Sequence, residues 1–178
     1  MTSPGVYVVA FSSDAGSAAG ALESAPVQLA SMEELLSVRP ELKLDGRRPD
    51  ARALTARLAA FWLPETVVYV GLATSLRSRV GAYYRTRLGA KRPHAGGWWL
   101  KTLGVLDELW VHYAPTPDFE CAEKRMLRAF ADGVAREARA ALYDRERVMP
   151  FAYLRGHDNL VKRHGIIGAT GDLPGPKD

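Results

Sequence analysis

Arg79 and Tyr83 are the first pair of side chains in this sequence whose types and spacing suggest chemistry. They lie four residues apart in the segment 74–88, which we expect to be helical, so both project from one helix face. Leu76 and Val80 flank that face and indicate that it turns partly inward. A guanidinium and a phenol held together can bind a phosphate group. The alternative is a surface arginine whose aliphatic stem packs on the tyrosine ring.

Glu123 occupies a position where a carboxylate is unexpected. The helix predicted to begin near Asp118 carries an apolar stripe that includes Phe119, Met126 and Phe130. Glu123 is four residues after the first of these, three before the second and seven before the third, so it faces the core. Because burial of an unpaired carboxylate is unfavourable, such a residue forms an ion pair or binds a cation. The sequence leaves both interpretations open.

Other familiar catalytic and metal-binding patterns are missing from the sequence. The histidines show no zinc-type spacing, and one cysteine, Cys121, cannot supply a thiolate site. There is no phosphate-binding loop of the Walker type and no GxSxG motif. His94 lies in a basic loop and is a candidate site residue, whereas we expect His112, within a strand, to be structural. Asn159 is the single asparagine of the chain.

Basic side chains are concentrated in residues 66–106, which contain no aspartate or glutamate although the whole chain has a net charge of only +4. The basic residues of this segment are Arg77, Arg79, Arg85, Arg87, Lys91, Arg92 and Lys101. Such asymmetry indicates a polyanionic partner, and arginine suits bidentate contacts with phosphate. A solvated basic face is the alternative. Trp98 and Trp99 follow this loop, either to stack on nucleic-acid bases or to pack a short helix onto the sheet.

Length and composition indicate one globular domain. The chain has 178 residues, of which 47% are hydrophobic and 25% are charged. No apolar run approaches the roughly 20 residues that cross a bilayer, and the start lacks the basic region of a secretory signal. We therefore expect no membrane association. The single cysteine favours the cytoplasm.

Three segments have the β-branched and aromatic composition of strands, at residues 5–11, 66–71 and 108–114. A helical insertion at 12–65 separates the first two, and helices follow the second and the third. This order predicts a small α/β (α+β) domain spanning 1–168, followed by a flexible tail at 169–178.

Local signals predict where the helices of the insertion begin and end. Ser31 and Glu34 form a capping box, so a short helix is expected to start there and stop at Pro40. Asp50 is expected to cap a second helix. In the last long helix, Gly133 is expected to cause an interruption.

Two short strings, "GVY" at 5–7 and "YVG" at 69–71, together with the arginine offset, resemble the GIY-YIG endonuclease superfamily. In that family an essential arginine lies ten residues after the second tyrosine and a histidine or tyrosine follows four later, which matches Arg79 and Tyr83. A glutamate on a later helix matches Glu123, and an asparagine near the end matches Asn159. The resemblance implies a small three-stranded, mainly antiparallel sheet flanked by helices.

Two features depart from the family pattern. Tyr7 and Tyr69 are 62 residues apart, whereas about ten residues usually separate the half-motifs, so 12–65 would be an insertion between the first two strands. Leu72 occupies a place where many members carry lysine. If that lysine helps to activate the nucleophile in those members, His94 or Tyr7 would take over here.

The resemblance implies hydrolysis of phosphodiester bonds in DNA with one Mg²⁺ or Mn²⁺ ion held by Glu123. Arg79 would contact the scissile phosphate, and Tyr7 or Tyr69 would orient or deprotonate the attacking water. Tyr83 or His94 would hold the water or a phosphate oxygen. Further, sequence-independent contacts with the nucleic-acid backbone are expected from Arg77, Arg85, Arg87, Lys91, Arg92 and Lys101.

Alternative functions remain open at this level. RNA is a second possible substrate, and a restriction-like role would favour a homodimer because two strands must be cut. A catalytically inactive nucleic-acid-binding module of the same fold is the main rival, favoured by Leu72 and by the long insertion. A third option is a protein-interaction domain that docks through residues 12–65.

Overall fold

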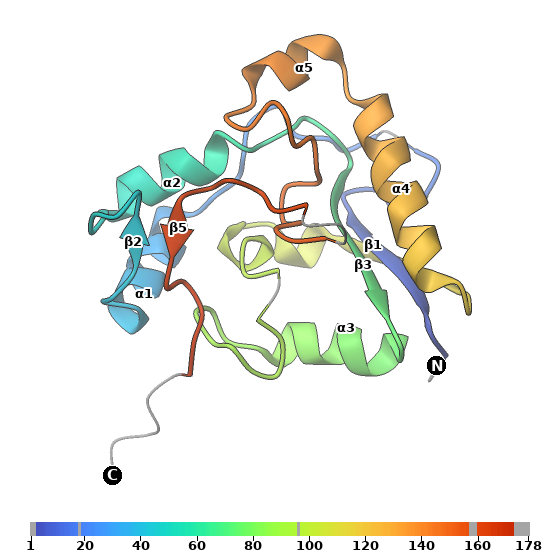
Figure 1. Ribbon diagram of the computed structural model, residues 1–178, viewed down its shortest axis with the longest axis horizontal. Coiled ribbons are helices and arrows are strands. Elements are labelled where there is room, and N and C mark those ends of the chain that lie inside the picture. Colours follow the sequence, from blue (N-terminus) through green and yellow to red (C-terminus); the bar gives the residue numbers. More distant parts are fainter. Residues whose placement is uncertain (1–2, 18, 96, 157–159, 173–178) are drawn as a thin grey trace.

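The structure is a computed structural model that describes residues 3–17, 19–95, 97–156 and 160–172. It has a mixed α/β architecture, with a three-stranded antiparallel sheet on one side of the molecule and a helical region on the other (Figure 1). Asn159, which the sequence singled out, lies outside the described residues. In the part of the chain that is described, no helix is both long and apolar enough to cross a membrane.

The sheet consists of β1 (Gly5–Ala10), β3 (Val67–Ala73) and β4 (Trp110–Pro115), in the order β3-β1-β4. Both pairs are antiparallel, so the three expected strands and the pairing of the first two are confirmed. The long excursion between β1 and β3 does not prevent their pairing, because the entropy of loop closure grows only slowly with loop length.

The register of this sheet brings the tyrosines of the two half-motifs to the same face. Tyr7 lies opposite Gly71, and Val9 lies opposite Tyr69. Residues that are directly paired, and residues two positions away, share one side of an antiparallel pair. Tyr7 and Tyr69 are therefore diagonal neighbours on one face of the sheet.

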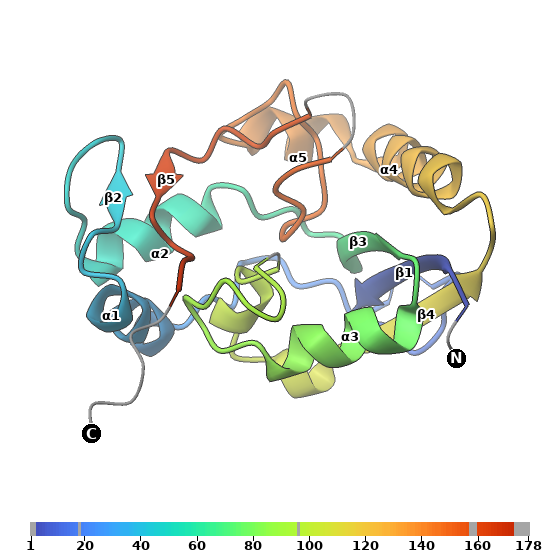
Figure 2. The same cartoon turned by 60° about the horizontal axis from the view of Figure 1, so that its bottom comes forward.

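Two helices cover the two faces of the sheet (Figure 2). Helix α3 (Leu76–Arg85) lies on the face of Tyr7, where Val80 and Tyr83 border a small cavity with Tyr7 and Val9. Helix α4 (Phe119–Gly133) lies on the opposite face. It ends at Gly133, as expected, and is followed by α5 (Arg136–Ala141).

Helix α3 is shorter than the sequence predicts, because it starts after Ser75 rather than Thr74 and ends at Arg85 rather than near Leu88. Thr86 explains the early end. Its backbone is extended, and its hydroxyl donates to Ala82 O at 2.7 Å while accepting from the backbone N–H of His94 at 2.9 Å. The side chain thereby ties the chain into the following loop.

The insertion contains α1 (Leu29–Val38), the short strand β2 (Lys43–Leu44) and α2 (Ala51–Ala59). Strand β2 pairs with β5 (Ile166–Ile167) near the end of the chain. The expected cap of α2 is confirmed, because Asp50 Oδ1 accepts from Ala53 N at 2.7 Å.

The predicted capping box at Ser31 is wrong, since α1 begins two residues earlier, at Leu29. The residue before the helix is Gln28, whose side chain makes no capping hydrogen bond. Its backbone N–H instead donates to Thr102 O at 2.8 Å. A tertiary contact therefore sets the start of this helix, and the local capping signal does not.

The predicted flexible tail begins too early. Residues 169–172 are docked on the body of the protein, where Gly171 O accepts from Lys91 N at 2.7 Å and from Arg39 Nη2 at 2.6 Å. Ala169 is buried. Residues 173–178 lie outside the described part of the chain.

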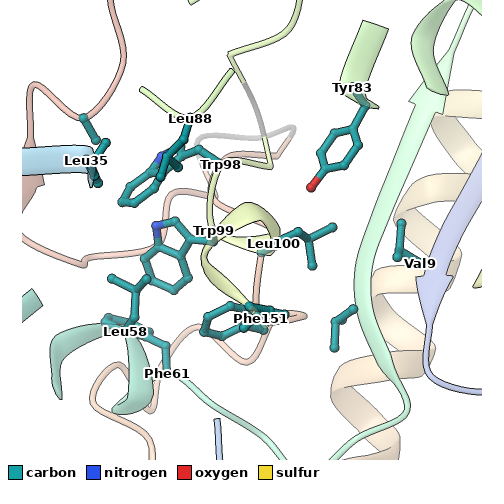
Figure 3. Packing of buried hydrophobic residues seen from close by; sticks show 14 of the residues in the cluster. Val9, Leu35, Leu58, Phe61, Tyr83, Leu88, Trp98, Trp99, Leu100 and Phe151 are labelled. Carbon is teal, nitrogen blue, oxygen red and sulfur yellow. The ribbon is translucent and has the colours of Figure 1, made fainter. Parts of the chain in front are cut away.

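One contiguous hydrophobic core joins the insertion to the sheet. Trp99 is fully buried and packs near Leu58, Phe61 and Phe151 (Figure 3). Trp98 is also buried. Both tryptophans therefore pack in the core, and stacking on bases is excluded for them in this conformation. They precede two short 3-10 helices, at Leu100–Thr102 and Leu106–Glu108.

Candidate functional site

Tyr7 and Tyr69 form the floor of the site, and Gly71 allows them to approach each other. Their ring centroids are 5.8 Å apart. A Cβ atom at Gly71 would lie 2.7 Å from Cζ of Tyr7 and 2.8 Å from Cε1 of Tyr69. Both distances are below the van der Waals limit, so the two rings can adopt this arrangement only over a glycine.

No group among the described residues makes a hydrogen bond of standard geometry with the buried Tyr7 hydroxyl, although the neighbouring Tyr69 hydroxyl is close enough to act on its pKa as a hydrogen-bond partner. Burial and the neighbouring Tyr69 phenol raise the pKa of Tyr7 well above its usual value of 10. Burial likewise raises the pKa of Tyr69. Both phenols are therefore protonated near neutral pH, and the unsatisfied hydroxyl of Tyr7 is suited to donate to a bound water or oxygen atom.

Arg79 reaches this floor from α3. Its side chain is exposed, and its positive charge partly offsets the effect of burial on the pKa of both Tyr7 and Tyr69. The guanidinium therefore acts on both phenols while remaining accessible to a ligand. This position agrees with the expected phosphate-binding role, which stays a prediction.

Glu123 reaches the site from α4, on the other side of the sheet. It is the buried residue of that helix, with an exposed fraction of 4%, so its predicted inward orientation is confirmed. Its carboxylate acts on Tyr69, where its negative charge raises the pKa of the phenol. Arg79 and Glu123 thus influence the same hydroxyl from opposite faces of the sheet.

Tyr153 donates a hydrogen bond to the Glu123 carboxylate, a contact that no sequence pattern indicated. The pKa of Tyr153 is raised by burial, by the charge of Glu123 and by a side-chain hydrogen bond to Glu123. The ring lies 6.3 Å from that of Tyr69. Because Ala152 N donates to Val68 O at 2.9 Å, the segment that carries Tyr153 runs along the outer edge of β3. The site therefore lies at this edge, where side chains from both faces meet.

Tyr83 and His94 differ from the sequence expectation. The Tyr83 hydroxyl is buried and donates to Gly97 O at 2.8 Å, so its proton is engaged and is not offered to a phosphate. His94 is also buried, and its ring packs edge-on against Tyr83 at 5.8 Å. In this conformation both residues support the floor beneath Tyr69, whose ring centroid is 6.4 Å from that of Tyr83.

Five of the six residues predicted to bind the nucleic-acid backbone are exposed, namely Arg77, Arg85, Arg87, Lys91 and Arg92. The sixth, Lys101, is half-buried, with its Nζ 5.4 Å from the centre of the Tyr83 ring. Burial lowers the pKa of Lys101. Its ammonium group therefore packs against the Tyr83 ring and is less available on the outer surface than the other five cations.

The residues of the site fit a hard divalent cation. Glu123 supplies one buried carboxylate, and Mg²⁺ is commonly held by one or two carboxylates together with waters and substrate phosphate. Among the described residues, no group of three or more His, Cys, Asp or Glu side chains is arranged as a complete metal cage. A cation at Glu123 would therefore complete its coordination with water and ligand oxygens.

The protonation of the tyrosines limits the chemistry they can perform. With pKa values raised by burial, Tyr7 and Tyr69 can orient a water molecule or stabilise an anionic oxygen by donating hydrogen bonds. The expectation that one of them deprotonates the nucleophile disagrees with these shifts. No family model, curated protein or solved structure gives a significant match to the chain.

Proposed function

We propose that this protein is a divalent-metal-dependent endonuclease of the GIY-YIG type that hydrolyses phosphodiester bonds in DNA. The observation that carries the proposal is the burial of Glu123 within electrostatic range of Tyr69, the phenol on which the exposed Arg79 also acts. A positive group for a phosphate and a buried carboxylate for a cation then both act on one hydrogen-bond donor. This is the set of functions that phosphodiester hydrolysis requires.

Arg79 would bind the scissile phosphate and stabilise the charge that develops on it. Its exposed side chain on α3 is accessible to a strand of nucleic acid, and the surrounding segment 66–106 contains no carboxylate that would compete for it. Preorganised donors of this kind contribute about 10²–10³ to the rate in other enzymes. The exposed arginines and lysine of the same segment would supply affinity without sequence specificity.

Glu123 would hold the cation. A buried carboxylate in a phosphate-binding site would repel its ligand unless a cation lies between them, so its position supports metal-dependent chemistry over simple binding. The bound ion would stabilise negative charge on the phosphate and on the leaving oxygen. Tyr153 would keep the carboxylate in one orientation through its hydrogen bond.

Tyr7 and Tyr69 would position the attacking water and a phosphate oxygen as neutral donors. The buried Tyr7 hydroxyl has no hydrogen bond of standard geometry with a described residue, and Tyr69 lies beside it, so the two phenols would donate together to a ligand oxygen that enters the site. Gly71 keeps both rings in place.

Cleavage of supercoiled plasmid in Mg²⁺ or Mn²⁺ tests the proposal. Glu123→Gln removes the charge while keeping the side-chain volume, and Arg79→Gln changes an exposed side chain, so both variants should fold. We expect each of them, and a chelator, to lower nicking by at least about 10². Arg77→Gln is the matched control, because it removes the same charge from the same helix and should leave most of the activity.

The same experiment separates the nuclease from an inactive nucleic-acid-binding module. That rival is favoured by Leu72, which pairs with Val6 and offers no ammonium group to the site. Binding of DNA without cleavage in either metal would identify the module. Absence of both binding and cleavage would exclude the two functions together.

A further inference from the structure

A second basic surface lies next to the site, between α4, α5 and the segment 145–149. It surrounds a groove of about 460 Å³. Five cationic side chains and one carboxylate line it: Lys124, Arg128, Arg139, Arg145, Arg147 and Glu146. None of these residues belongs to the basic segment 66–106. We call this surface the α4 groove.

The α4 groove begins at Lys124, the residue that follows Glu123. Leu127 and Ala131, which line it, follow Glu123 by one and two helical turns and so continue the same row of side chains. Lys124 and Arg128 stand beside that row. The eight helical residues from 124 to 131 span about 10 Å, which is close to three nucleotide steps along a duplex.

The opposite wall of the groove belongs to the segment that also positions Glu123. Residues 145–149 and Leu160 border the groove, and Tyr153, which lies between them in sequence, holds the Glu123 carboxylate. A ligand in the groove would therefore contact the same unit of structure that orients the expected cation ligand.

Arg139 is one fixed positive charge in the lining of the groove. Its Nη2 donates to Ala131 O, which fixes the guanidinium against α4. Its Nε is buried and has no acceptor among the described residues.

The charges of the groove select an anionic ligand. Arg147 is neutralised by Asp144 and Glu146, at 3.2 and 3.4 Å, and serves to hold the loop. Lys124, Arg128, Arg139 and Arg145 also line the groove, and the carboxylate that lines it, Glu146, is shared with Arg163 at 3.5 Å. Arginines in this setting suit the oxygens of phosphodiesters.

We infer that the α4 groove binds the DNA backbone on the side of Glu123 away from α3, so that the strand passes over the site between two basic surfaces. This inference rests on the proposed function, because it assumes that the scissile phosphate lies between Arg79 and Glu123. The groove extends the contact by about three nucleotides beyond the cleavage point.

Binding of a labelled 20-base-pair DNA duplex, measured by fluorescence anisotropy with chelator present, tests the inference without cleavage. The variant Arg128→Gln/Arg145→Gln changes two exposed side chains of the groove. We expect its affinity near 0.1 M salt to fall on the order of tenfold, and the slope of log affinity against log salt to decrease by about two.

The control Arg48→Gln/Arg52→Gln removes the same charge from two exposed positions, one before α2 and one in its first turn, that do not line the groove. Equal losses in the two double variants, or no duplex binding by the unmodified protein, would overturn the inference. Plasmid nicking in the same preparations distinguishes the two proposals. If the protein nicks plasmid but the groove variant binds DNA as tightly as the unmodified protein, the groove proposal is refuted and the nuclease proposal stands. If the groove variant binds DNA more weakly but the unmodified protein does not nick plasmid, the nuclease proposal is refuted and the groove proposal stands.

Discussion

Removing the Tyr153 hydroxyl tests whether the contact with Glu123 organises the site. In Tyr153→Phe the ring remains, so its packing 6.3 Å from Tyr69 is retained while the hydrogen bond to the carboxylate is lost. Hydrogen bonds to charged groups contribute about 1.5–3 kcal/mol, and Glu123 is buried with little access to compensating solvent. We therefore expect the free energy of unfolding to fall by about 2 kcal/mol.

The same variant should bind divalent cations less tightly. A hydrogen bond to a metal-binding carboxylate fixes its orientation, and loss of such a partner typically costs 10- to 100-fold in affinity. Titration with Mn²⁺, followed by the free-ion signal in electron paramagnetic resonance, measures this directly. Urea denaturation measures the change in stability, and neither assay depends on catalysis.

Tyr143→Phe is the matched control, because it removes one hydroxyl from an exposed tyrosine. Its aromatic contacts with Phe61 and Arg57 depend on the ring and should persist. If Tyr153→Phe and Tyr143→Phe have the same stability and the same Mn²⁺ affinity, Tyr153 does not organise Glu123 and the geometry proposed for the site is refuted.

Two further perturbations test the core beneath the site. Lys162 is fully buried, donates from Nζ to Pro150 O and Phe151 O at 2.9 and 2.7 Å, and has its pKa lowered to about 7 by burial. The unfolded chain binds the Lys162 proton more tightly than the folded protein does. The free energy of unfolding should therefore rise with pH from about 7 to about 10, by at most about 1.4 kcal/mol per pH unit. This gain in stability is lost as the pH falls toward 7. Urea unfolding at pH 7.5, 8.5 and 9.5 should show a smaller slope in Lys162→Met, and equal slopes would contradict the assignment. Gly71→Ala should destabilise the protein by about 1–3 kcal/mol, because its Cβ would collide with two buried tyrosine rings. The control Gly81→Ala, on α3, faces only the flexible end of Arg85 and should stabilise the helix by about 0.5–1 kcal/mol, so equal effects of the two substitutions would refute the packing argument.

Features that depend on neighbouring residues in sequence were predicted successfully. The three strands follow from runs of β-branched and aromatic residues, and Asp50 caps α2 as its side-chain chemistry requires. The inward orientation of Glu123 follows from the 3.6-residue period of one helix, which is a purely local property.

Features that depend on distant parts of the chain were missed or predicted wrongly. Helix α1 starts at Leu29 because the preceding residue is held by Thr102, more than seventy positions away in sequence. Residues 169–172 look like a tail in sequence, yet Arg39 and Lys91 bind them. Neither contact leaves a periodic or compositional trace.

The candidate site shows the same division. The amino-acid sequence alone determined that a positively charged helix follows the second strand and that one carboxylate lies on an apolar stripe, because each depends on residues within a single element. Only the tertiary structure decided that the charges of Arg79 and Glu123 act on the same phenol, that Tyr153 donates to the carboxylate, and that Tyr83 donates to a backbone carbonyl. Sheet register and the path of the chain along the edge of β3 set these contacts, and both arise from the packing of the whole molecule.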